Sequence, residues 1–355
     1  MSIPPSSYDD LMAQQHTAAV EVTGAHHSNW NGKMGPTRKV ENGVILGTAS
    51  WDSGVLYDDK YVTGPLKEMF EHKGVQQEQA KLLAYRNALK TVLHENSHMT
   101  SAEGTTHADA MHAFQQPPVR ALEEGVTEAW SYANLDQYID KLDLEKIAPG
   151  IKEVQGRQSY PQFAPAANAL ANRIGEVSGV DSNEVLRRMN VVNGAEKWPI
   201  ATKLVTDAAG LDKIVPPAQL AEATQRVEQA MQAPFGTLAD VSKLPADQQR
   251  PRSAEIGNEA FDAGQKEIAA IKQEVATTGG LQPKVAEVTA QTDGKKAEAT
   301  AQTAGADPKL AHAMAMANSG TAPLQGVQAG AASQAAVAAK PAGPAVGRGQ
   351  GLDRD

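Results

Sequence analysis

The sequence predicts an α+β protein, in which a small antiparallel sheet and one long helix precede a mostly helical lobe and a disordered tail. Three observations support this prediction. A β-rich run spans residues 44–51, helical periodicity without Gly or Pro runs from residue 76 to residue 98, and the composition shifts to Ala, Gly, Gln, Thr and Pro after Gly279. The globular part is therefore expected to end near residue 278.

The predicted strands come early in the chain. Residues 44–51, with the sequence Val-Ile-Leu-Gly-Thr-Ala-Ser-Trp, give the clearest strand signal. Two further apolar pieces, Val55–Tyr57 and Tyr61–Val62, flank an Asp-Asp-Lys turn and are typical of a small hairpin or meander. We therefore expect a small antiparallel sheet ahead of the long helix.

The motif His94-Glu95-Asn96-Ser97-His98 falls on the last turns of that helix. Large residues precede it at helical spacing: Leu82, Tyr85, Leu89, Val92 and Leu93. Positions i and i+4 of a helix lie one above the other, so both imidazoles can bind one ion while Glu95 lies within reach of a water on that ion. We expect the helix to end between His98 and Gly104, and the motif to supply two zinc ligands and a general base.

A catalytic zinc site needs a third protein ligand and one open position. Downstream, the run Glu123-Glu124-Gly125-Val126-Thr127-Glu128 puts carboxylates four residues apart on one helix face. One of them can bind the ion, and the next can accept the ring N–H of a ligating histidine. The sequence therefore predicts a third zinc ligand and a second carboxylate that supports a ligating histidine.

The two motifs together resemble those of the gluzincin metallopeptidases, typified by thermolysin, in which Asn-Glu-x-x-Ser-Asp gives the third zinc ligand and a supporting acid. The resemblance implies a zincin-like fold, Zn²⁺ held by His94, His98 and Glu124, and Glu128 behind a ligating histidine. It also implies an edge strand beside the metal that pairs with substrate main chain. This chain departs from the family pattern at Glu123, which replaces Asn, and has Thr127 and Glu128 for Ser and Asp.

Other zinc motifs fit less well. Ser101 and Gly104 occupy the positions where a metzincin needs Gly and His, and the chain has no cysteine for a deformylase-type site. Residues 104–112 resemble the Gly-Thr-x-Asp signature of aspzincins, with a histidine in place of the ligating Asp. Alternative third ligands are therefore His107, Asp109 and His112, and Glu124 is preferred because its motif includes a supporting acid.

Thermolysin-like enzymes carry a histidine beyond the third ligand that stabilises the oxyanion. Here the only histidine after His112 is His312, which lies in the predicted tail. A phenol or a guanidinium can donate to a developing oxyanion instead. The candidates for this catalytic role are Tyr132, Tyr160 and Arg157.

Helical signals continue after the second motif, and they define the predicted domains. Apolar periodicity supports helices at residues 128–144, 166–177, 182–189 and 198–205, and weaker ones at 220–231 and 256–275. The predicted division is an N-terminal extension (1–35), a zincin-like domain (36–215), a helical accessory region (216–278) and a disordered tail (279–355). Within the domain, the strands and zinc helix occupy about 36–105, and the acid-motif helix and helical lobe about 118–215.

Composition limits the possible functions. The net charge is −9 and the pI is about 5.5, which disfavours nucleic-acid binding. No run of apolar residues is long enough for a membrane span, and the N-terminus lacks a secretory signal pattern. A cytoplasmic location is the default expectation, and export by a route independent of a signal peptide is also compatible.

These patterns lead to a functional hypothesis. We expect a zinc metallopeptidase that acts on a protein or peptide substrate, with Glu95 as general base. The alternatives are a secreted or injected effector peptidase of narrow specificity, and a non-catalytic helical interaction protein with a degenerate zinc site. In either case, residues 216–355 are a candidate region for binding a protein partner.

Overall fold

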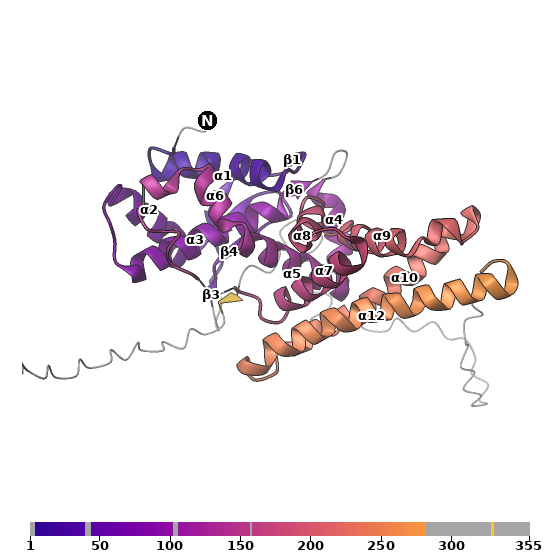
Figure 1. The fold of residues 1–355 in the computed structure, drawn as a ribbon. Coiled ribbons are helices and arrows are strands. Elements are labelled where there is room, and N and C mark those ends of the chain that lie inside the picture. Colours follow the sequence, from indigo (N-terminus) through magenta and orange to yellow (C-terminus); the bar gives the residue numbers. More distant parts are fainter. Residues whose placement is uncertain (1–3, 40–43, 102–105, 157, 282–327, 330–355) are drawn as a thin grey trace, which may run out of the picture.

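The computed structural model describes residues 4–39, 44–101, 106–156, 158–281 and 328–329. They form an α+β fold in which a small sheet is accompanied by a predominantly helical lobe (Figure 1). The predicted fold class is therefore confirmed for this part of the chain. The predicted disordered tail lies almost entirely outside the described residues.

All strands are two or three residues long. They are β1 (His27–Ser28), β2 (Met34–Pro36), β3 (Val44–Ile45), β4 (Gly47–Ala49), β5 (Val55–Tyr57), β6 (Thr100–Ser101) and β7 (Gln328–Ala329). The main sheet has the order β2-β5-β4, and β5 pairs antiparallel with β4 but parallel with β2. It is therefore a mixed sheet with β4 at one edge, and the parallel β2–β5 pair differs from the antiparallel sheet that the sequence predicts. Antiparallel pairs also join β1 to β6 and β3 to β7.

The predicted strand at Tyr61–Val62 is wrong, because this segment is helical. A π-helical turn spans Asp59–Thr63 and leads directly into α2 (Gly64–Glu71). The Asp58 carboxylate caps the turn by accepting hydrogen bonds from the backbone N–H groups of Lys60 and Tyr61. This local cap outweighs the β-propensity of Tyr61 and Val62.

Six helices build the N-terminal half with the sheet: α1 (Tyr8–Thr23), α2, α3 (Gln79–His98), α4 (His107–Ala113), α5 (Pro117–Ala133) and α6 (Leu135–Lys141). Helix α3 ends at His98, as predicted. The helix expected over residues 128–144 is instead divided at Asn134, whose side-chain amide donates to the Trp130 carbonyl. Trp130 itself is buried in the core, also as expected.

The predicted N-terminal extension contributes to the core. Leu11 and Met12 of α1 are buried, and α1 contacts α3 and α6. Gln15, on the same helix, is fully buried and accepts a hydrogen bond from the Tyr57 hydroxyl of β5. Helix α1 therefore packs against α3, the helix that carries the histidine motif.

The helical lobe consists of α7 (Ala164–Ser178), α8 (Ser182–Asn190), α9 (Lys197–Ala209), α10 (Leu220–Phe235), α11 (Leu238–Val241) and α12 (Ala246–Thr278), with 3-10 turns at Leu144–Lys146, Leu211–Lys213 and Pro217–Gln219. These helices include each of those predicted beyond residue 160. Asp181 caps α8 through its carboxylate, as its position suggested. None of the described helices combines the length and apolar character that crossing a bilayer requires.

Helices α10 and α12 run side by side along one end of the molecule (Figure 1). Their apolar faces join the core of the preceding residues, through side chains such as Phe235 and Ile256. Helix α12 also crosses α7, where the Ser253 hydroxyl accepts a hydrogen bond from the Ala166 N–H in the first turn of α7. The predicted accessory region thus packs against α5, which carries the second motif, and against α7.

One close contact positions α5, the helix that carries the second motif. Gly125 of α5 faces α7, and a Cβ at this position would lie only 2.8 Å from the Phe163 carbonyl oxygen. Glycine is therefore required for α5 to approach this closely. Helix α5 contacts α3 on another side, so the two motifs face each other across the core.

Candidate metal centre

Three side chains from the two predicted motifs meet between α3 and α5. The ligand atoms of His94, His98 and Glu124 all lie within 4.8 Å of one another, and all three residues are buried. The two Nε2 atoms are 3.2 Å apart, and Glu124 Oε2 lies 3.7 Å from that of His94 and 3.8 Å from that of His98. The residues thus form a group that can hold a metal ion.

The spacing of these atoms suits a tetrahedral site. Zinc bonds of roughly 2.0–2.1 Å place neighbouring ligand atoms about 3.4 Å apart in a tetrahedron. The two histidine nitrogens are already near this separation, and the Glu124 oxygen needs to approach by only a few tenths of an ångström. Three ligands in this arrangement leave a fourth position open.

Unsatisfied polar atoms give a second indication of a bound cation. Among the described residues, both carboxylate oxygens of Glu124 and Oε1 of Glu95 are buried without a hydrogen-bond partner. Buried carboxylates without donors are costly unless they are paired or bind a metal. The group therefore fits a divalent cation by geometry and by charge.

His94 is held from behind by a glutamate and a lysine. Its Nδ1 lies 3.1 Å from Glu128 Oε2, and Glu128 Oε1 accepts a 2.8 Å hydrogen bond from Lys90 Nζ. Burial by itself would raise the pKa of the Glu128 carboxyl, but Lys90 and His94 bring it down to about 2. An ionised Glu128 keeps the proton of His94 on Nδ1 and leaves Nε2 directed toward His98 and Glu124. These three residues, His94, His98 and Glu124, are called the metal-binding group.

His98 has the same kind of support. Its Nδ1 lies 2.7 Å from Glu123 Oε1, and Glu123 Oε2 lies 3.3 Å from Lys197 Nζ at the start of α9. Burial opposes ionisation here as well, yet Lys197 and His98 lower the pKa of the Glu123 carboxyl to about 2. Sequence reasoning treated Glu123 only as a departure from the family motif and missed both lysines, whose pairings are long-range.

The pKa of His94 reflects the negative charge of the surrounding carboxylates. Burial by itself would lower the pKa of His94, but the carboxylates of Glu124, Glu128 and Glu95 raise it to about 10. The negative charge around the imidazole therefore outweighs the effect of burial. A metal ion that binds here therefore displaces a proton.

Glu95 lies against the edge strand β4. A Cβ on Gly47 would lie 2.5 Å from Glu95 Oε1 and 2.6 Å from its Cγ, so glycine is needed for this contact. Burial raises the pKa of the Glu95 carboxyl, although His94, His98 and the Ala49 backbone oppose the change. Glu95 is thus held beside the two histidines. Nothing in the sequence marked Gly47 as part of the site.

Tyr160 is the oxyanion candidate that the structure brings to the centre. Its ring stacks on His94, with centroids 5.5 Å apart and planes 12° apart, and its backbone has a left-handed φ of 47°. Burial, followed by the nearby Glu124 and Glu95 carboxylates, raises the pKa of the phenol well above its usual range. Tyr160 therefore keeps its proton and can act as a hydrogen-bond donor.

The structure does not bring the other two oxyanion candidates to the centre. Tyr132 is 37% exposed, and its hydroxyl donates to the Gly156 carbonyl oxygen at 3.1 Å, so it is engaged at the surface. Arg157 lies outside the described residues.

His107 and His112, two of the alternative third ligands, are not part of the group. His107 is buried but stacks on Trp51 with ring centroids 4.6 Å apart, and burial lowers its pKa to about 4. His112 is exposed, and the side chain of Asp109 is not described. Glu124 is therefore the ligand that the described residues favour over His107 and His112.

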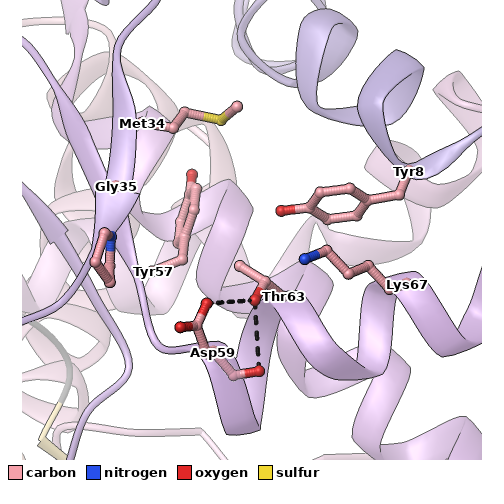
Figure 2. Close-up of a pocket in the computed structure, with 8 residues that line it drawn as sticks. Tyr8, Met34, Gly35, Tyr57, Asp59, Thr63 and Lys67 are labelled. Atoms are coloured by element: carbon pink, nitrogen blue, oxygen red, sulfur yellow. Dashed lines mark hydrogen bonds between the residues drawn. The ribbon is translucent and has the colours of Figure 1, made fainter.

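A surface cleft of about 210 Å³ lies elsewhere (Figure 2), between α1, β2 and the start of α2. Figure 2 shows Tyr8 and Lys67 facing Tyr57 across it. The Tyr57 hydroxyl contacts Asn96, which is two positions from His94 and so projects from a different face of α3. The cleft therefore lies on a different face of α3 from His94 and His98.

This arrangement has the parts of a hydrolytic metal site: three ligands, a supported tautomer on each histidine, an adjacent carboxylate and a phenol donor. Its resemblance to the gluzincins stays a prediction. No protein-family model, curated protein or solved structure matches this chain.

Proposed function

We propose that this protein is a zinc metallopeptidase that hydrolyses peptide bonds. The observation that carries the proposal is the buried group of His94, His98 and Glu124 with the unpartnered Glu95 carboxylate oxygen beside it. A purely structural zinc usually has four protein ligands and needs no adjacent base. Three ligands and a neighbouring carboxylate favour catalysis.

Each residue has a defined role in this proposal. Zn²⁺, when bound to the three ligands, would supply Lewis acidity for a water and for the scissile carbonyl. Glu95 takes the proton from the attacking water and returns it to the leaving amine. The Tyr160 phenol donates a hydrogen bond to the carbonyl oxygen as negative charge develops there.

The sheet provides a place for the substrate. Strand β4 is an edge strand of the described three-stranded sheet and lies against the motif helix. Its partner in the described sheet is β5, and Gly47 of this strand lies directly against the Glu95 side chain. An extended peptide added along this edge would be bound through its main chain.

The test combines metal content with peptide cleavage. Wild-type protein should contain one zinc per chain and cleave members of a broad peptide library, and a chelator should abolish cleavage. Glu95→Gln should retain zinc but lose at least about 10²-fold in turnover, the usual contribution of a general base. Glu124→Ala should lose zinc and activity together.

Glu176→Gln, an exposed change on α7, is the matched control and should behave as wild type. The absence of zinc from wild-type protein after equilibration with the metal would contradict the proposal. Undiminished turnover by Glu95→Gln would remove Glu95 from the mechanism.

A further inference from the structure

Two buried lysines stand behind the metal-binding group in matching positions. Lys90 Nζ contacts Glu128 at 2.8 Å, and Lys197 Nζ contacts Glu123 at 3.3 Å. In each branch, one glutamate oxygen faces a ligating histidine and the other faces the lysine. The lysine side chains are only 5% and 1% exposed, so both ion pairs lie in the protein interior.

With both histidines neutral, as ligation of a metal requires, the formal charges of this region do not balance without a cation. Four buried glutamates surround the two histidines: Glu95, Glu123, Glu124 and Glu128. The two lysines compensate the pair that supports the histidines, which leaves two formal negative charges on Glu95 and Glu124. A divalent cation neutralises this remainder. The lysines therefore pair with Glu123 and Glu128, which orient the histidines, and leave Glu95 and Glu124 for the cation.

We propose that Lys90 and Lys197 are positioning residues that set the affinity of the site for a divalent cation. Lys90 holds Glu128 against His94, and Lys197 holds Glu123 against His98. This inference rests on the metal-binding part of the proposed function. Neither lysine touches the substrate or the reacting atoms, because each acts through a glutamate and then a histidine.

Each lysine makes further contacts that hold its ammonium group in place. Lys90 lies one turn before His94 on α3, and its Nζ also donates to the Ser159 hydroxyl at 2.6 Å. Lys197 Nζ donates to the carbonyl oxygens of Met189 and Val192 at 2.9 and 3.2 Å, beyond its contact with Glu123. The second branch therefore ties the ends of α8 and α9 to the metal-binding histidine.

Removal of one lysine has a defined consequence. The carboxylate oxygen that it contacted would be left buried without a charged donor, and the glutamate would turn to other donors or compete with Glu124 for the cation. The histidine would lose the fixed acceptor for its Nδ1–H, so its Nε2 would no longer be held on the metal. A glutamine in place of that glutamate removes the excess charge and retains a carbonyl oxygen for Nδ1–H.

The experiment measures zinc affinity of the full-length chain by competition with a chromogenic chelator, and the Co²⁺ absorption spectrum as a report on coordination. The single variants are Lys90→Met and Lys197→Met. The neutral pairs are Lys90→Met with Glu128→Gln, and Lys197→Met with Glu123→Gln. Lys81→Met on α3 and Lys203→Met on α9 are matched controls, because they break more exposed ion pairs on the same two helices.

Each single variant should weaken zinc binding by about 10–100-fold and change the Co²⁺ spectrum, as expected when a ligand's supporting partner is lost. Each neutral pair should recover most of the affinity and the wild-type spectrum, and the controls should stay within about twofold of wild type. A lysine that serves only to stabilise the fold would not show this recovery. Unfolding curves of all variants establish that the folded protein is measured, and the Lys90 branch decides the outcome if Lys197→Met does not fold.

Two results would overturn the inference alone: wild-type affinity in both single variants, or neutral pairs that bind no better than the single variants. Wild-type protein that binds no zinc would overturn this inference and the proposed function together. Zinc binding without peptide cleavage would contradict only the proposed peptidase activity, since the roles of the lysines are judged from affinity.

Discussion

Glu123 and Glu124 are neighbours in the chain but have opposite electrostatic surroundings. Glu123 faces Lys197 and the Nδ1 of His98, whereas Glu124 Oε2 lies 3.7 and 3.8 Å from the Nε2 atoms of His94 and His98. Successive helical residues project about 100° apart, which is enough to direct Glu123 behind His98 and Glu124 to the position of the proposed metal. At this scale, direction and partner decide the role of a side chain, and residue type does not.

Gly47 offers a test at the same scale. Gly47→Ala places a Cβ where the Glu95 carboxylate lies, and this flexible side chain must move away. We expect turnover to fall by about 10²-fold, the scale of a 1 Å misplacement of a catalytic group, with zinc content unchanged. Peptide cleavage and metal analysis on the same preparation check both parts.

Gly35→Ala is the control for this change, because on β2 the new Cβ meets only a Leu56 methyl group at 3.2 Å. Equal activity of Gly47→Ala and Gly35→Ala would show that the β4 contact does not position Glu95.

Element packing determines whether the two motifs meet. Helices α3 and α5 carry the ligands, α7 packs on α5 at Gly125, and α12 packs on α7. Most of these helices were predictable, since their apolar periodicity and caps are local. Their contacts were not, and the short π-helical turn at Asp59–Thr63 shows how one capping carboxylate can override a strand-like pattern.

The crossing of α7 and α12 can be tested by substitution. A Cβ on Gly257 would lie 2.3 Å from the Ala166 carbonyl oxygen and 2.9 Å from its Cα, so Gly257→Val forces the helices apart. We expect the free energy of unfolding to fall by about 1–3 kcal/mol, the usual cost of overpacking. Urea denaturation measures this change.

Ala269→Val, at an exposed position of the same helix, should cost only about 0.5 kcal/mol through helix propensity. Similar losses for both variants would mean that α12 does not pack on α7 in this way.

At the scale of the whole molecule, the metal-binding group connects segments that are distant in sequence. Its ligands come from α3 and α5, and its supporting residues include Lys197 of α9 and Ser159 beside α7. The same hydrophobic core extends from α1 to α12. Bound metal should therefore stabilise the entire fold as well as the site, because an unfolded chain has no preformed set of ligands.

Metal removal tests this connection. At a free zinc concentration of a hundred times Kd, binding adds about 2.7 kcal/mol to the free energy of unfolding. For a domain of this size, we expect a chelator to lower Tm by about 5–10 °C, and zinc to restore it. Differential scanning calorimetry measures the shift. Glu124→Ala should show no such response, and a wild-type Tm that is indifferent to chelator would contradict a bound metal.

The sequence by itself determined the α+β class, the end of the motif helix within residues 98–104 and the pairing of an i, i+4 histidine motif with a downstream carboxylate. These features follow from local periodicity and spacing, which any single helix expresses. Only the tertiary structure decided that Lys90 and Lys197 balance the supporting glutamates, that Gly47 makes room for Glu95, and that Tyr160 stacks on His94. Burial is the physical reason: charge compensation and close approach are demanded only in the dry interior, and which residues share that interior depends on how the helices pack.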